Sequence, residues 1–319
     1  IYRAWFAYGN PAAAAQLASI LLAAVFAVVL IEQASRGARR YAQASASLRE
    51  IRPWTLRGWS AAVAVAFCVV PVAVGFLVPA AVLANMTLDV APELSPARLV
   101  VLTANTGMLA GVAAAVAVGL AALVSFAAGR SASTARQLAR FTYLGYATPG
   151  VVVGVGLLIV AGAADAALRA GGGFQGLVLS GSFGLLIYAY VVRFFAVAHG
   201  PVDAAYVKLG PRYGEAARTL GLRPGAVLWR VDAPMMRGTM LAAAALVFVD
   251  VMKELPATMI LRPFNFDTLA TEAFQLATTE RLDQAALPAL AIAAAGLIPV
   301  ALLILGMRRA RPGPLEVRP

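Results

Sequence analysis

The segment YGEAARTLGLRPGAVLWRVDAP, Tyr213 to Pro234, interrupts a very apolar region of the chain with a short, charged sequence. Pro211 is suited to open a helix, because the first helical turn does not use its N–H groups, and Gly221 is suited to end one. The helix between them is too short to cross a bilayer, which takes roughly 20 residues. Pro224 is suited to begin a second short helix before the chain becomes apolar again.

The first short helix has one apolar and one charged face. Tyr213, Ala217 and Leu220 follow the spacing i, i+4, i+7, so they share a face that can rest on the protein body. Glu215 and Arg218 lie at i and i+3, where they can pair with each other or be offered to a partner. The pattern leaves two interpretations open: a helix that docks a partner, or an interfacial helix that only caps a bundle.

The composition is that of an integral membrane protein. Mean hydropathy is +0.80, with 61% apolar and 13% charged residues, whereas a soluble domain is closer to half apolar. Runs rich in Ala, Leu and Val with embedded Gly fit helices rather than the short alternating strands of a barrel. The sequence therefore predicts an all-α membrane protein with seven spans, at 12–31, 59–84, 103–128, 143–163, 177–198, 238–260 and 287–306.

The net charge of +11 does not indicate a nucleic-acid partner, because the distribution of the basic residues along the chain is explained by the membrane topology. If loop 199–237 is cytoplasmic, twenty of the 26 lysines and arginines fall on the inner side and five on the outer side, while Lys253 lies in a span. Basic residues favour the cytoplasmic side of membrane proteins, so this orientation is expected. The outer loops are then 85–102, 164–176 and 261–286.

The spans suggest three parts. Residues 1–57 hold one span and a basic, polar linker, residues 58–311 hold six spans with the loop 199–237, and residues 312–319 are expected to be disordered. A weak echo appears when residues 1–39 are laid on 273–311, where Tyr2 meets Phe274. Such matches arise easily by chance in an alanine-rich chain, but repeated halves are common in transporters. If the echo is a repeat, residues 1–31 are the last span of a preceding half.

Three charged residues fall inside the predicted span 238–260. Asp250 precedes Lys253 and Glu254 by three and four positions, so all three can share a face, and Pro256 then disrupts the helix. Ionisable groups in a bilayer are costly and usually face a pathway or a partner. One interpretation is a gate or polar lining whose carboxylates suit a hard cation. The other is an internally neutralised Lys–Asp or Lys–Glu pair.

Other polar and small residues are less informative. Cys68 is a single thiol in an apolar span and is expected in the core, and His199 is expected at an interface, because no Cys or second His is present to complete a metal site. Glycines four residues apart, at 107 and 111 and at 150 and 154, allow close helix approach. The outer acids are either solvated or face a basic partner: Asp89, Glu93, Asp165, Asp267, Glu272, Glu280 and Asp283.

Several segments resemble one family. The spacing of Glu215, Ala216, Ala217, Gly221, Val231, Ala233 and Pro234 resembles the EAA motif of binding-protein-dependent ABC importer permeases of the type I fold, which prefer Ile and Leu where this chain has Val231 and Ala233. TANTGMLAG (103–111) and YATPGVVVGVGLL (146–158) look like the same family. KELPATMILRPFNFDTLATEAF (253–274) resembles its ferric iron branch, whose permeases carry two fused halves. The resemblance covers essentially 1–311 and implies the C-terminal half of such a permease.

The resemblance implies that the short helix is a coupling helix that docks on the ABC ATPase dimer, whose closure on ATP reorients the spans. The implied coupling residues are Glu215, Ala216, Ala217, Arg218, Gly221 and Pro234. The chain has no GxxxxGK[ST] loop, so it cannot be the ATPase. The resemblance implies a transport subunit rather than an enzyme, with no cofactor on this chain and with ATP and Mg on the partner. The other implied partners are an extracytoplasmic substrate-binding protein and a second permease half, in a bacterial inner membrane.

Alternatives to a ferric iron permease stay open. The same machinery could carry another small solute, such as thiamine, sulfate or a polyamine. A secondary transporter driven by an ion gradient would show broken spans with paired polar motifs in both halves. An intramembrane enzyme would need a His, Ser or Asp constellation at one depth.

Overall fold

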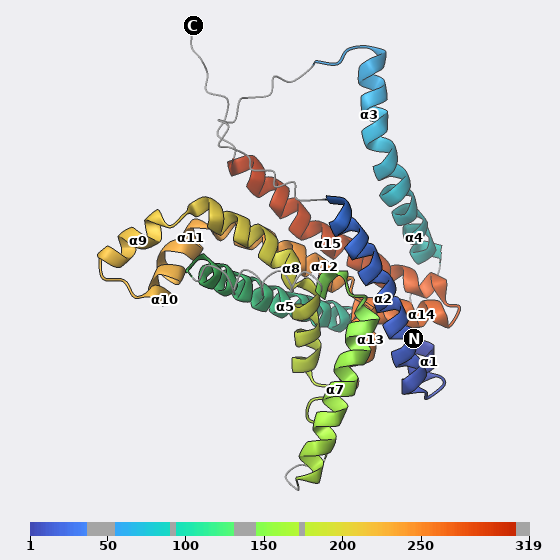
Figure 1. Cartoon of the computed structure of the whole chain (residues 1–319). Helices are drawn as coiled ribbons and strands as arrows, with labels where there is room; N and C mark the ends of the chain where they lie inside the picture. The colour runs from blue at the N-terminus through green and yellow to red at the C-terminus, as the bar shows by residue number, and fades with distance from the viewer. Residues whose placement is uncertain (37–54, 90–93, 131–144, 172–175, 311–319) are drawn as a thin grey trace.

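The computed structural model describes residues 1–36, 55–89, 94–130, 145–171 and 176–310, and all regular structure within them is helical (Figure 1). The all-α membrane fold is therefore confirmed. The elements are α1 (Tyr2–Phe6), α2 (Pro11–Arg36), α3 (Trp59–Val72), the π-helix η1 (Ala73–Leu77), α4 (Val78–Asp89), α5 (Pro96–Arg130), α7 (Gly150–Ala170), α8 (Phe183–Leu209), α9 (Arg212–Thr219), α10 (Pro224–Val227), the π-helix η2 (Leu228–Asp232), α11 (Ala233–Met235), α12 (Arg237–Met252), α13 (Pro256–Leu261), α14 (Leu269–Thr278) and α15 (Leu282–Ala310).

Within the described residues, six helical segments are long and apolar enough to cross a membrane, and a bent pair that includes α12 makes up to seven. Two predicted spans are shifted. The span expected at 143–163 lies at 150–170, because Pro149 precedes the first turn of α7. The span expected at 177–198 begins at Phe183, where the Ser182 side chain accepts the Leu185 N–H (3.1 Å), and continues to Leu209.

The predicted span 238–260 is broken. Helix α12 ends at Met252, and Pro256 occupies the first turn of α13, where its missing N–H costs nothing. The outer loop predicted at 261–286 contains helix α14, which begins with a capping box between Thr268 and Thr271. The disruption expected at Pro256 is thus confirmed, and the predicted outer loop contains a helix of ten residues.

Helices α5, α8 and α12 pack on one another and hold the core. The buried face of α5 is mostly alanine, which lets α8 and α12 come close in an apolar environment. Its buried alanines are Ala110, Ala113, Ala114, Ala117, Ala121, Ala122 and Ala128. Larger side chains of the partner helices, such as Leu186 and Tyr190 of α8 and Val247 of α12, fill the space beside them.

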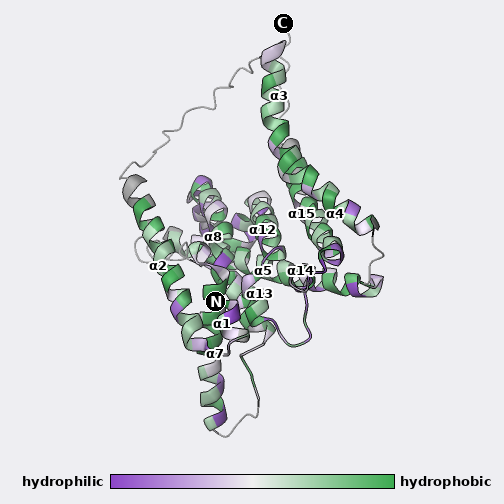
Figure 2. Cartoon of the chain, turned by 90° about the vertical axis from the view of Figure 1, so that its right-hand side faces the viewer, coloured by the Kyte–Doolittle hydropathy of each residue, from purple (hydrophilic) through white to green (hydrophobic). Residues whose placement is uncertain are grey.

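The other helices lie around this core. Helix α2 packs on α7, and α4 packs on α15. Helix α3 has no buried residue, although it is among the most hydrophobic parts of the chain (Figure 2). Cys68 is exposed on it, so the predicted core position is wrong. An apolar surface of this size has to be covered by lipid or by another subunit.

The glycine pairs behave differently. A Cβ atom at Gly154 would lie 3.1 Å from the side chain of Ile260, so α7 and α13 approach closely there. A Cβ atom at Gly107 or Gly111 would meet nothing within 4 Å. Of the two predicted pairs, the one on α7 lies at a close helix contact and the one on α5 does not.

The two ends of the described chain repeat one arrangement. Helices α1 and α2 are joined through Gly9 at φ 56°, and helices α14 and α15 are joined through Glu280 at φ 62°. Tyr2 and Phe274, which the sequence echo aligns, meet edge to face with ring centroids 6.3 Å apart. The echo is therefore matched by a short helix, a left-handed residue and a long helix at both ends.

Candidate functional site

Helix α9 begins and ends where the sequence predicts. Pro211 precedes its first residue, and Gly221 follows its last turn at φ 87°. The Gly221 N–H donates to the Arg218 carbonyl (2.9 Å) and the Leu222 N–H donates to the Ala217 carbonyl (3.1 Å). These two bonds form the helix stop that requires a left-handed residue, which glycine adopts at little cost.

The predicted apolar face of α9 does not rest on the protein body as a whole. Ala217 is buried, but Tyr213 and Leu220 are 52% and 82% exposed. Helix α9 packs on η2, and a Cβ atom on Gly214 would lie 3.4 Å from Val227, so only small residues fit at this contact. Tyr213 and Leu220 are left on the outer surface of the short helix, where a partner can reach them.

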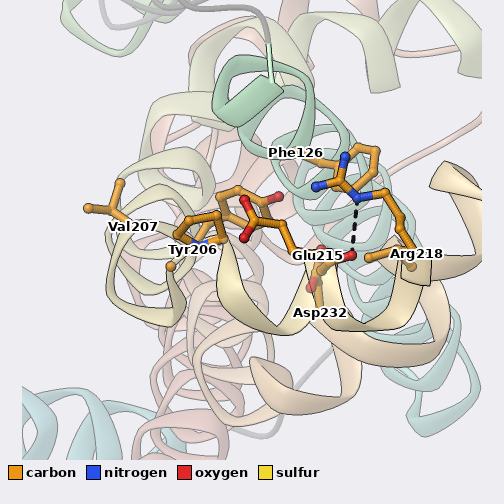
Figure 3. A pocket seen from close by; sticks show the side chains of 10 residues that line it. Phe126, Tyr206, Val207, Glu215, Arg218 and Asp232 are labelled. Carbon is orange, nitrogen blue, oxygen red and sulfur yellow. Dashed lines mark hydrogen bonds between the residues drawn. The ribbon is translucent and has the colours of Figure 1, made fainter. Parts of the chain in front are cut away.

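Glu215 and Arg218 do not pair with each other among the described residues. The Arg218 Nε–H donates instead to the Gly214 carbonyl (3.1 Å). Both side chains line a cavity of about 420 Å³ beneath α9, together with Phe126, Tyr206 and the buried Asp232 (Figure 3). The Arg218 guanidinium lies beside Phe126, and the Glu215 carboxylate lies on the Tyr206 side.

Two helices of the core carry this unit. Helices α9, α10 and α11 lie together beyond the ends of α8 and α12 (Figure 1). The chain leaves α8 at Gly210 and Pro211, and it enters α12 through a bend of 81° at Met236. Pro234 lies in α11, just before this bend. Helix α9 is therefore connected through the chain to both α8 and α12.

The three charges predicted on one face separate into two pairs. The Lys253 ammonium lies 2.8 Å from the Asp250 carboxylate, and the Lys253 side chain is 64% exposed. Glu254 is buried and forms an ion pair with Arg193 of α8 instead. The Lys–Asp pair that the sequence offered as one interpretation is therefore present, whereas Glu254 does not join it, because the helix ends at Met252.

Arg193 is not among the site residues chosen from the sequence, although it lies inside the predicted span 177–198. It lies 16 residues before the end of α8, and Glu254 lies 17 residues after the start of α12. At 1.5 Å per residue both stand roughly 25 Å from the ends that carry α9. Opposite charges at matching depth on adjacent spans are the signal that could have identified the pair.

Further polar groups surround the Arg193–Glu254 pair. The Ala257 N–H donates to Glu254 Oε1 (3.2 Å), and the Thr258 hydroxyl donates to the Glu254 carbonyl (2.6 Å). The Tyr190 and Thr258 hydroxyls are 2.7 Å apart. A Cβ atom on Gly150 would overlap both charged side chains, so glycine lets α7 close over them. The pair joins α8, the α12–α13 break and the start of α7.

A second charged cluster ties the segment after α13 to the start of α5. Arg98 lies 2.5 Å from Asp267 and 3.1 Å from Glu272, and Arg262 also pairs with Asp267. The Asn105 side-chain amide donates to the Asp267 carbonyl (2.9 Å). Burial lowers the pKa of Arg262 from its usual value, but an arginine still remains charged at physiological pH.

Three of the acids expected at the outer surface have internal partners. Asp267 and Glu272 belong to the arginine cluster, and Asp165 is buried, with its carboxylate accepting three backbone N–H groups of the segment 178–180. His199 is also buried and stacks on Phe195 (5.3 Å between ring centroids), and its expected position at the membrane interface stays a prediction. Within the described ranges no group of three or more His, Cys, Asp or Glu could hold a metal ion.

Asp267→Ala is expected to lower the free energy of unfolding by about 1–3 kcal/mol, because it removes the carboxylate shared by Arg98 and Arg262. The Arg98 side chain is 39% exposed, which limits the cost. Denaturant unfolding of the purified chain in detergent measures the change in the free energy of unfolding. Glu280→Gln, at an exposed carboxylate, is the control. Equal loss in both variants would contradict a structural role for the cluster.

Comparison with known proteins settles the fold. No protein-family model matches the chain. It superposes with a TM-score of 0.61 on a chain of a bacterial ABC transporter involved in the import of the acidic polysaccharide alginate, over 80% of this chain and 96% of that one, at 13% identity. The same score is found for the alginate ABC transporter in complex with an alginate pentasaccharide-bound periplasmic protein, at 14% identity. The chain has the fold of an ABC importer permease.

Two curated relatives agree with the permease fold. The Fe(3+)-transport system permease protein FbpB 2 of Haemophilus influenzae is 27% identical over 138 residues, which are 43% of this chain and 25% of that protein. A permease named for a 2-aminoethylphosphonate transport system, PhnV of Salmonella typhimurium, is 28% identical over 144 residues, 45% of this chain and 50% of the relative. The match thus spans a quarter to a half of these relatives. The resemblance to ABC importer permeases is confirmed, and that to the ferric branch has modest support.

The names of the relatives and the apolar helices agree with one kind of subunit. Both relatives are named as transport permeases, as expected for a transport subunit rather than an enzyme. The apolar helices make the chain a multi-pass membrane protein. The division at residues 57 and 58 stays a prediction, and the tail 312–319 and most of the linker lie outside the described residues.

Proposed function

We propose that the chain is the membrane-embedded half of an ATP-driven importer of ferric iron, coupled through α9 to a separate ABC ATPase dimer that holds ATP and Mg. An extracytoplasmic binding protein would hand over the cargo. The observation that carries this proposal is α9 itself. It is a short helix with a glycine stop, it presents Tyr213 and Leu220 outward, and it is joined at both ends to helices of the core.

Coupling follows from these connections. An ATPase that holds α9 differently in its two nucleotide states favours a different position of α8 and α12 in each state. The difference in its binding free energy for the two positions determines how far their populations shift. Arg193 and Glu254 lie on α8 and directly after α12, so a relative movement of these helices changes the ion pair. The pair is the candidate gate, with Asp250, Lys253 and Pro256 around the helix break.

Ferric iron is favoured by the chemistry of the helix break and by one relative. Asp250 and Glu254 supply carboxylate oxygens, which suit hard cations, once the paired cations move away. A phosphonate is the second candidate cargo, because the other relative is named for one and the Arg193 guanidinium is suited to a phosphonate group. Thiamine, sulfate and polyamines stay further alternatives. An ion-gradient-driven transporter is less favoured, because the fold matches that of an ABC importer over 80% of the chain.

A second permease half is part of the proposal. The relative named for Fe(3+) transport has about 550 residues, since 138 are 25% of it, which is room for two six-span halves. The phosphonate relative has about 290, since 144 are 50% of it. The repeated arrangement of α1–α2 and α14–α15 supports residues 1–36 as the end of a preceding half. Another copy of the chain is the alternative partner.

The orientation completes the proposal: a bacterial inner membrane with α9 on the cytoplasmic side. Arg212, Arg218, Arg223 and Arg230 lie on or beside the α9–η2 unit, which fits the basic bias of cytoplasmic loops. A cysteine introduced at Leu220, which is 82% exposed, can be labelled from the side that the helix faces. If a membrane-impermeant reagent labelled this cysteine in intact cells, α9 would lie on the outer side and the proposed orientation would be wrong.

The test is to replace Glu215 by Ala and Gly221 by Val and to measure ATPase association and iron uptake in vesicles. A β-branched residue at φ 87° costs about 1–3 kcal/mol of local strain, enough for roughly a tenfold loss of uptake. Gly225→Ala is the matched control, because Gly225 has a helical backbone and open space beside it. Unchanged association and uptake in both variants, or full uptake without an ATPase, would refute the proposal.

A further inference from the structure

A second cavity, of about 760 Å³, lies where the α9 unit joins the core. The last turn of α8 and the start of α9 supply Lys208, Arg212 and Tyr213. The bend before α12 supplies Met235 and Thr239. The cavity therefore touches both connections through which α9 is attached to the transmembrane helices.

The polar lining of this cavity is cationic. Lys208 and Arg212 are both exposed, and neither forms an ion pair within the part of the chain that the structure describes. No acidic residue lines the cavity, whereas the cavity beneath α9 contains Glu215 and Asp232. An anion is therefore attracted more strongly to the second cavity than to the first, where two carboxylates accompany the single guanidinium of Arg218.

The surroundings of the cavity are apolar on the side of the spans. Val207 of α8 and Leu241 of α12 are 72% and 69% exposed, and Met235 and Tyr213 at the rim are about half exposed. Spans α8 and α12 end at this level, so an apolar surface meets a basic polar one. Phospholipid phosphates occupy this boundary, with tyrosines and basic side chains beside them.

We infer that this cavity binds the phosphate of an anionic phospholipid headgroup. Lys208 and Arg212 supply the two positive charges, the Tyr213 and Thr239 hydroxyls can donate hydrogen bonds, and the acyl chains lie along the exposed surface of α8 and α12. A headgroup held there bridges both attachments of α9 and stiffens them. That consequence for coupling, and the choice of the inner leaflet, rest on the proposed function, whereas the binding itself does not.

The test measures lipid retained by the purified full chain, without ATPase or cargo. The chain is extracted from vesicles of equal parts phosphatidylglycerol and phosphatidylcholine, and bound lipid is counted by native mass spectrometry. We expect retained phosphatidylglycerol to fall at least about tenfold in Lys208→Ala/Arg212→Ala, as each charge near the surface contributes about 1 kcal/mol. The variant Lys208→Met/Arg212→Met, which keeps the apolar stems, is expected to show the same loss.

Arg57→Ala is the matched control, because Arg57 is an exposed arginine beside the start of α3 and does not line the cavity. It is expected to retain lipid like the unaltered chain. Equal retention in the double variants, or equal loss in the control, would overturn the inference. Displacement of the lipid by millimolar inorganic phosphate would also overturn it, since the cavity would then bind a free anion. Uptake data on Glu215 and Gly221 bear only on the proposed function.

Discussion

Glu254→Ala is expected to lower the free energy of unfolding by about 3–5 kcal/mol and to abolish transport, because it leaves Arg193 buried without its counter-charge. The Glu254 side chain is 8% exposed and that of Arg193 15%, so water cannot readily replace the lost partner. Glu254 also accepts the Ala257 N–H at the start of α13, and this bond is lost as well. Arg193→Ala is expected to cost a similar amount. Denaturant unfolding in detergent and uptake in vesicles measure the two effects.

The double variant Arg193→Met/Glu254→Met distinguishes the contribution of the ion pair to stability from its role in transport. Apolar side chains of similar size remove both charges together, so most of the lost stability should return. Transport is expected to stay absent if the charges act on the cargo, and its recovery would show that the pair is only structural. Asp250→Ala is the control, because it breaks a pair whose lysine is 64% exposed and should cost at most about 1 kcal/mol. Single variants as stable as the unaltered chain would contradict the burial argument.

Asp165→Ala is expected to cost about 2–4 kcal/mol, because three backbone N–H groups lose their acceptor. Its two oxygens accept from Val178 (3.0 Å), Leu179 (2.8 Å) and Ser180 (2.9 Å), and thereby fix the segment before α8 on α7. The stability loss of Asp165→Asn should lie between that of Asp165→Ala and zero, since an amide keeps a single acceptor oxygen.

Hydrogen exchange of the amides of residues 178–180 measures this release directly. Their exchange is expected to become at least about a hundredfold faster in Asp165→Ala, because 1.4 kcal/mol of lost protection corresponds to a factor of ten. Arg169→Ala on the same helix is the control, since Arg169 donates to the backbone carbonyl of Asp165 (3.3 Å) and its loss leaves the Asp165 carboxylate in place. Unchanged exchange at all three amides would show that the carboxylate does not hold the segment.

Much of the candidate coupling site could be predicted because its signals are local. Pro211 and Gly221 act within one helical turn of themselves, and the structure places α9 between them. The side chains that α9 exposes could not be predicted in the same way. Ala217 alone is buried because η2 packs there, and that contact depends on the fold of the whole connection.

The apolar spans, their approximate order, the break at Pro256 and the short helix between α8 and α12 could all be predicted from the order of the residues. These features depend on contact with lipid or on hydrogen bonds between near neighbours, which a stretch of residues specifies alone. The folded chain was needed to find that Glu254 pairs with Arg193 rather than with Lys253, and that Asp267 pairs with Arg98, 169 residues away. Such partners depend on how each helix is rotated and how deep it lies, and packing against the other helices sets both.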